Sequence, residues 1–179
     1  REAIEECHEF KVEQLLSILG NSLPQEDTSY ASFLGLKAKY YFNCQRNILK
    51  AIQINDSAIA IWKKTGIAPT ESFNLLLLNA SSYVHRNGDK KAAKDYLERG
   101  LKNQESLGSA GAGLLAEFYI RKGILYQANS ESTLALEHFQ QAARIAEQIP
   151  GEKGKTSYIK TILNIGDAIA RKGNTKQGL

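Results

Sequence analysis

One stretch, residues 119–142, most constrains what this chain can fold into. It reads as two helices split at residues 129–130, and the first of them contains a glycine, Gly123, in its middle. Glycine inside a helix costs about 1 kcal/mol relative to alanine, so Gly123 needs a packing reason, and close approach of a neighbouring helix supplies one. The second helix carries small residues on either side of an aromatic: Ala135, Phe139 and Ala142. The stretch therefore predicts two antiparallel helices that cross at Gly123, against the side of the second helix that bears Ala135 and Ala142.

The small residue of this crossing recurs along the chain. Ser81, Gly123 and Gly166 occupy equivalent places, at intervals of 42 and 43 residues. A fixed interval of this length indicates a repeat protein in which each repeat is one supersecondary unit. Helical periodicity predicts a first helix over residues 1–19 and helix pairs over 29–43 with 47–64, 72–86 with 89–107, and the two halves of the central stretch.

A fifth pair is predicted to begin at Lys155, with Gly173-Asn174 as the turn that ends its first helix. We expect one helical-repeat domain over residues 1–179, and we expect the chain to be a fragment of a longer one because it begins at Arg1 and contains no methionine. The expected units are a partial repeat at 1–22, a degenerate repeat at 28–66, repeats at 70–108 and 112–150, and an incomplete repeat at 155–179.

These residues resemble the tetratricopeptide repeat (TPR), a helix-turn-helix unit with the pattern W-x2-L-G-x2-Y, then A-x3-F, then P. Tyr119 stands at the tryptophan, Lys122 at the leucine, and Pro150 comes later than the pattern has it. The long interval is similar to the extended repeats of kinesin light chains, of Leu-Gly-Asn-repeat polarity scaffolds and of bacterial peptide-pheromone regulators. The resemblance implies an all-α, right-handed TPR superhelix, a solenoid of antiparallel helical hairpins.

Composition is that of an ordinary soluble protein, with 42% hydrophobic and 23% charged residues. The longest unbroken run of apolar residues is far shorter than the roughly 20 that a membrane helix needs, so we expect no membrane contact and a cytoplasmic protein. The two cysteines, Cys7 and Cys44, are too few and too widely spaced for a disulfide framework or a zinc site, and we expect reduced, buried thiols.

Charge is unevenly distributed. Residues 1–30 contain seven acidic and two basic residues, a net charge of −5, whereas the rest of the chain carries +9. A basic body favours an acidic partner, although a solvated helical surface explains the same charges. No dense stripe of Arg and Lys with interleaved aromatics occurs, so we expect no contact with nucleic acid.

The residue types that carry catalysis do not converge in this sequence. His8, His85 and His138 are far apart, and none belongs to a metal-binding pattern. We therefore predict a protein that is not an enzyme and that has no catalytic residues, metal or cofactor.

The candidate binding residues come from the resemblance, which implies that the first helices of successive repeats line a concave groove. Two residues before each small crossing residue, the chain has Asn79, Arg121 and Asn164. The strings around Asn79 and Asn164 are similar to the L-x-N-x-G strings of asparagine-ladder repeats, in which groove asparagines hold the main chain of an extended peptide. A carboxamide can match a peptide N–H and C=O together, and Arg121 would favour a carboxylate.

Six more side chains are expected to approach the groove: Ser82, His85, Ile124, Gln127, Asp167 and Arg171. An alternative is that Asn79 and Asn164 only form local hydrogen bonds between helices. The function favoured by the sequence is non-catalytic binding of a peptide or extended protein segment. Two others stay open: the oligopeptide-sensing domain of a bacterial transcription or signalling regulator, and a structural scaffold that oligomerises.

Overall fold

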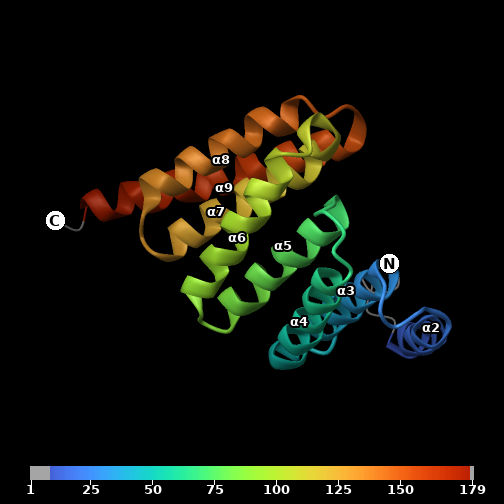
Figure 1. Ribbon diagram of the computed structural model, residues 1–179. Helices are drawn as coiled ribbons and strands as arrows, with labels where there is room; N and C mark the ends of the chain where they lie inside the picture. The colour runs from blue at the N-terminus through green and yellow to red at the C-terminus, as the bar shows by residue number, and fades with distance from the viewer. Residues whose placement is uncertain (1–8, 178–179) are drawn as a thin grey trace. The chain divides into compact units, whose positions relative to one another are not determined.

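The computed structural model describes residues 9–177, except for the side chains of residues 9–11, 109–110 and 174–177, and over that range it contains helices and no strand. The helices are α2 (Glu9–Ser22), α3 (Thr28–Asn43), α4 (Ile48–Lys64), α5 (Glu71–Arg86), α6 (Lys90–Glu105), α7 (Ala112–Ala128), α8 (Ser132–Glu147) and α9 (Gly151–Gln177), with a short 3-10 helix, η1 (Gly108–Gly111), before α7 (Figure 1). The predicted all-α fold is confirmed.

The chain divides within α6, between Tyr96 and Leu97, into two compact units. The first unit contains α2 to α5 and the start of α6, and the second contains the rest of α6, η1 and α7 to α9. Each unit buries its own cluster of apolar side chains.

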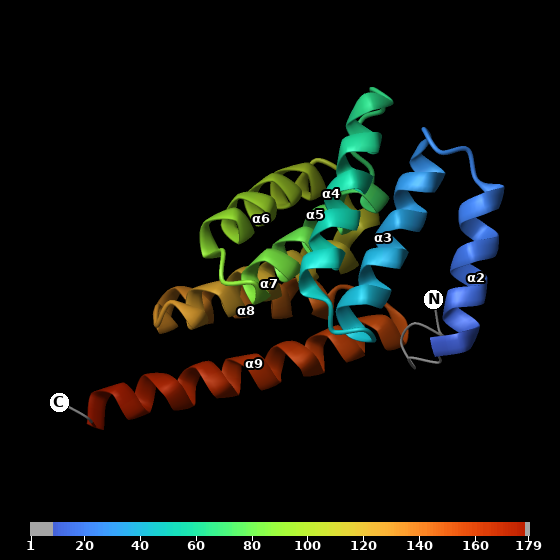
Figure 2. The ribbon, with the colours of Figure 1, turned by 90° about the horizontal axis from the view of Figure 1, so that it is seen from below.

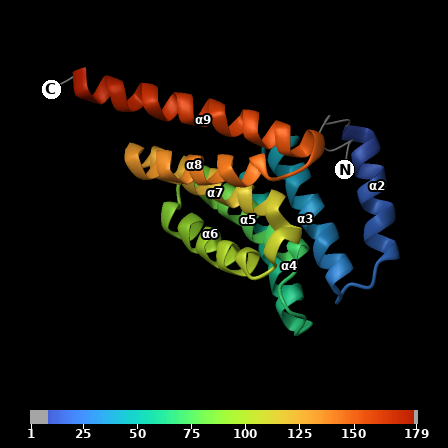
Figure 3. The same cartoon turned by 90° about the horizontal axis from the view of Figure 1, so that it is seen from above.

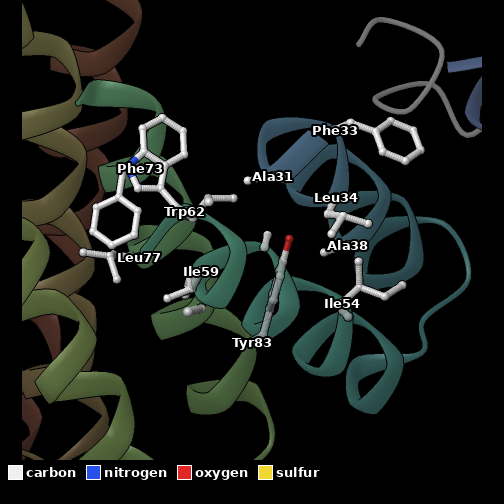
Figure 4. Close-up of a cluster of buried hydrophobic side chains, with 14 residues drawn as sticks. Ala31, Phe33, Leu34, Ala38, Ile54, Ile59, Trp62, Phe73, Leu77 and Tyr83 are labelled. Carbon is white, nitrogen blue, oxygen red and sulfur yellow. The ribbon is translucent and has the colours of Figure 1, made fainter. Parts of the chain in front are cut away.

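The core of the first unit lies between α3, α4 and α5. The indole of Trp62 and the ring of Phe73 lie side by side, 5.6 Å between centroids, next to the fully buried Leu77 (Figure 4). Asn55 takes the place of the aromatic that the repeat pattern has in its second helix, and it is fully buried. Its amide donates a hydrogen bond to the carbonyl of Leu76 at 3.0 Å, so a polar link between α4 and α5 replaces the missing ring.

The core of the second unit contains the predicted crossing. Gly123 is buried on α7, and a Cβ added to it would lie 2.5 Å from the ring of Phe139 on α8. The predicted close approach at Gly123 is therefore confirmed, but the ring of Phe139 is what fills it. Ala135 and Ala142 are fully buried in the same cluster and let the two helices come near enough for that contact.

The turns within two helix pairs lie where the sequence predicts them, before α6 and before α8. The side chain of Asp89 accepts a hydrogen bond from the backbone N–H of Ala92 at 2.9 Å, which caps the start of α6. The central stretch breaks at residues 129–131, where Ser130 has a φ of 63°.

The end of the chain differs from the prediction. α9 begins at Gly151, which has a φ of 77°, and runs for 27 residues through Gly173 and Asn174, where we expected a turn. The earlier turn at Gly88 is followed directly by another helix, α6. A glycine costs a helix only about 1 kcal/mol, so Gly173 alone is not enough to end α9. Figure 3 shows α9 lying beside α8.

The apolar face predicted for the first helix is only partly correct. Val12 is buried and Leu16 is packed beside it against Tyr40 of α3, but Leu15 and Leu19 are exposed. Figure 2 shows α2 lying beside α3. This happens because α2 has a partner on one side only, α3, among the described helices. The start of the expected helix, with Ile4, Cys7 and His8, lies outside the described residues.

The expectation of reduced thiols is wrong at Cys44, which is disulfide-bonded. Sequence spacing does not show this pairing, because it depends on how the chain folds back on itself. Within the described range, none of the helices has the length and apolar character that crossing a membrane requires.

Candidate functional site

The nine predicted binding residues lie on three helices, α5, α7 and α9. Asn79, Ser82 and His85 are half-buried on α5, in the first unit. The other six lie on α7 and α9, in the second unit: Arg121, Ile124, Gln127, Asn164, Asp167 and Arg171.

Helices α7 and α9 are in contact along part of their length. Polar residues that are 40 or 43 positions apart in the sequence pair across these helices, on a surface that we call the α7–α9 face. Its polar members are Glu117, Arg121, Gln127, Lys160, Asn164, Asp167 and Arg171.

An ion pair joins α7 to α9 at one end of the α7–α9 face. The ammonium of Lys160 lies 2.7 and 2.9 Å from the two carboxylate oxygens of Glu117. The two residues are 43 positions apart in the sequence. Both side chains are partly exposed, so the pair adds little stability, but it fixes α7 and α9 in register at this point.

At the other end of the face, hydrogen bonds connect three residues of α7 and α9. The amide of Gln127 donates to one carboxylate oxygen of Asp167 at 2.8 Å, and Nε of Arg171 donates to both oxygens at 3.1 and 3.2 Å. These three predicted binding residues are brought together, and their hydrogen-bonding groups engage one another.

In the middle of the face, Arg121 and Asn164 keep polar atoms that have no hydrogen-bond partner among the described residues. Nε of Arg121 is buried and has no hydrogen-bond partner among the described residues, and no described carboxylate forms an ion pair with this side chain. The amide of Asn164 donates to the carbonyl of Lys160 in its own helix at 2.9 Å. That local bond is the alternative foreseen for Asn164, and it leaves the side-chain oxygen without a donor from the described residues.

The three predicted binding residues on α5 also differ in their surroundings. The hydroxyl of Ser82 donates to the carbonyl of Leu78 at 3.1 Å, within its own helix, while Asn79 and His85 are half-buried. They belong to the first unit, and the α7–α9 face belongs to the second.

A ring stack joins α7 to α8 elsewhere in the second unit. His138 lies between Tyr126 and Tyr119, with centroid distances of 5.1 and 6.0 Å. Burial lowers the pKa of His138 below its ordinary value of 6.5, and the nearby charge of Lys122 lowers it further. Burial also raises the pKa of Tyr119, whose hydroxyl donates to Glu105 at 3.1 Å.

The described residues contain no cluster of three or more His, Cys, Asp or Glu that could hold a metal ion. The α7–α9 face presents the cation of Arg121, the carboxamide oxygen of Asn164 and the apolar side chain of Ile124.

Sequence reasoning missed Glu117 and Lys160. A signal for them was present: they carry opposite charges and are separated by 43 residues, the repeat interval between Gly123 and Gly166. Opposite charges at the repeat interval on first helices should meet, because each repeat presents the same helix face to its neighbour.

No protein-family model matches the sequence, and no curated protein matches it. Solved structures of similar fold exist. BtubC (BKLC) from P. vanneervenii is 19% identical with a TM-score of 0.78, and the match covers 93% of this chain and 67% of that one.

A second similar structure is a putative kinesin light chain of Podosopora anserina with nearly identical TPR-like repeats. It is 21% identical with a TM-score of 0.62, and the match covers 98% of this chain and 80% of that one. Together with the helix pairs at 42–43-residue intervals, these likenesses show that the chain has the fold of a TPR-like helical repeat protein.

Proposed function

We propose that this protein is a non-catalytic binding module that holds an extended, acidic peptide segment on the α7–α9 face. Arg121 would take a carboxylate of the ligand, and Asn164 would take a main-chain N–H. An extended peptide suits the site because its backbone groups recur at regular spacing whatever its sequence.

The observation that carries the proposal is the Nε atom of the Arg121 guanidinium, which is buried without a hydrogen-bond partner among the described residues. The polar groups at both ends of the face are already paired, whereas Nε of Arg121 is buried without a partner among the described residues. A buried polar group without a hydrogen bond costs about 1–3 kcal/mol, and a carboxylate ligand would remove that cost.

The experiment is selection of peptides from a random displayed library on the purified chain, followed by calorimetric titration of the selected peptides. We expect the selected peptides to be enriched in Asp and Glu. Arg121→Gln should weaken their binding by about 1.5–3 kcal/mol, and Asn164→Ala by about 1–3 kcal/mol, because each removes a partner from a desolvated group. Binding to the wild type should weaken as salt is added.

Arg144→Gln is the matched control, since Arg144 is an exposed cation on α8. It removes the same charge from the molecule and should leave the affinity unchanged. Selected peptides without acidic enrichment, or equal losses in Arg121→Gln and Arg144→Gln, would show that the α7–α9 face is not the site.

The oligopeptide-sensing function would use the same face and differ only in its ligand, a free peptide with a terminal carboxylate instead of a segment with acidic side chains. Titration with C-terminally amidated peptides separates the two, because amidation removes only the terminal charge.

A further inference from the structure

Helix α7 carries a carboxylate one turn before Arg121. Glu117 and Arg121 are four residues apart, with the acidic residue nearer the start of the helix, which is the favourable arrangement for an ion pair within one helix. No ion pair joins these two side chains, and Nε of Arg121 is buried without a hydrogen-bond partner among the described residues. The structure therefore lacks a contact that the local sequence favours.

The same spacing does produce a pair on α9. Asp167 and Arg171 are also four residues apart, and Nε of Arg171 donates to both carboxylate oxygens, at 3.1 and 3.2 Å. The spacing, the charges and their order along the helix are alike at the two places. The difference between them must therefore come from what the neighbouring helix presents to each carboxylate.

Lys160 of α9 supplies that difference. Its ammonium lies 2.7 and 2.9 Å from the two carboxylate oxygens of Glu117, so both oxygens are engaged by the other helix. Asp167 instead meets an uncharged group from the other helix, the amide of Gln127. A hydrogen bond to a charged donor is stronger than one to a neutral amide, so Glu117 stays with Lys160 while Asp167 also pairs within its own helix.

We propose that Lys160 is a positioning residue of the peptide site, which holds Glu117 away from Arg121 and so leaves the guanidinium for a carboxylate of the ligand. The inference rests on the proposed function for its ligand, whereas the partner that Glu117 takes is a property of the free protein. Without the charge of Lys160, Glu117 should turn to Arg121. An acidic peptide would then have to displace an internal carboxylate before it could bind.

The first experiment needs no ligand. In NMR spectra of the 179-residue chain, the Nε–H proton of Arg121 is identified by its loss in Arg121→Gln. We expect this proton to shift downfield in Lys160→Gln, because it gains a carboxylate acceptor, and to return to its wild-type position when Glu117→Gln is added. An unchanged shift in Lys160→Gln would show that Glu117 does not turn to Arg121, and the inference would be wrong.

The second experiment is calorimetric titration with the tightest-binding acidic peptide from the library selection. Lys160→Gln should weaken binding about two- to fivefold, the range that a partly exposed ion pair supplies. Adding Glu117→Gln to that variant should restore the affinity. In the wild type the same substitution should have a smaller effect, because Lys160 already holds the carboxylate there. Such non-additivity is expected if Glu117 changes its partner.

Lys155→Gln is the matched control. Lys155 lies on the same helix and forms an exposed ion pair with Glu152 at 4.0 Å, so the substitution removes the same charge and breaks a pair away from the α7–α9 face. This variant should bind the peptide as the wild type does. Circular dichroism melts check that every variant is folded.

Four binding results would overturn the inference. Equal losses in Glu117→Gln and Lys160→Gln would mean that the pair only aligns the two helices. A double variant as weak as Lys160→Gln would mean that Lys160 contacts the ligand itself. An equal loss in Lys155→Gln, or an equal gain from Glu117→Gln with and without Lys160, would mean that overall charge sets the affinity.

Failure of the proposed function would look different. If Arg121→Gln leaves peptide binding unchanged, the α7–α9 face is not the peptide site. The NMR experiment would then still decide whether Lys160 determines the partner of Glu117.

Discussion

At the scale of single residues, two glycines at the same repeat position have different neighbours. Gly123 and Gly166 are 43 residues apart and occupy the same place on α7 and α9. The first lies against the ring of Phe139, and the second has no neighbour within 4 Å of its missing Cβ. Sequence alone makes the two glycines look equivalent, because the repeat pattern records the helix but not whether a partner covers it.

The two glycines therefore form a matched pair for a stability test. Gly123→Ala should lower the free energy of unfolding by about 1–3 kcal/mol, because a methyl group would overlap the Phe139 ring and force it to move. Gly166→Ala should raise it by up to about 1 kcal/mol, since alanine is the better helix former and space is available. Denaturant titration followed by circular dichroism, at a dilution where the chain is monomeric, measures both. Changes of the same sign in the two variants would contradict the assignment of the crossing.

At the scale of elements, the ring stack between α7 and α8 makes their contact sensitive to pH. Burial, with Lys122 nearby, holds the pKa of His138 below 6.5, while Glu137 acts in the opposite direction. Between the folded pKa and 6.5 the unfolded chain binds more protons than the folded one. The contribution of His138 is therefore fully present above pH 6.5 and is lost as the pH falls towards the folded pKa.

His138→Phe should keep the stack with Tyr119 and Tyr126 and remove this dependence. We expect the wild type to lose more stability than the variant between about pH 7.5 and pH 5, by less than about 1 kcal/mol, because the half-exposed ring is partly screened by solvent. Denaturant titrations of both proteins at the two pH values give the difference. Equal losses in the two proteins would mean that protonation of His138 does not weaken the α7–α8 contact.

The positions of most helices could be predicted from the sequence, but what each helix contacts could not. Helical periodicity and the Asp89 N-cap predict local structure, which depends on residues close in sequence. The continuation of α9 through Gly173 and the disulfide at Cys44 depend instead on what the chain meets after folding. The candidate site divides in the same way: register predicts that Arg121 and Asn164 lie on helices one repeat apart, but only the structure shows that Asn164 bonds to its own helix.

At the scale of the whole molecule, the chain consists of two compact units, each with its own core. In repeat proteins, stability is approximately a sum of repeat and nearest-neighbour terms, because each repeat contacts only its neighbours. The chain offers a natural probe of this behaviour. Its single tryptophan, Trp62, is buried in the core of the first unit beside Phe73, so its fluorescence reports on that unit, whereas circular dichroism reports on all the helices.

Phe139→Ala removes a fully buried aromatic ring from the core of the second unit and should destabilise that unit by about 3–5 kcal/mol. We expect the circular dichroism transition in urea to begin at lower denaturant and to broaden, because α7 to α9 unfold early. The fluorescence transition of Trp62 should move much less, because that side chain lies in the other core. The converse variant, Ile59→Ala in the first unit, should shift the fluorescence transition instead. If Phe139→Ala moves both signals by the same amount, the two units unfold together, and the additive description does not hold for this chain.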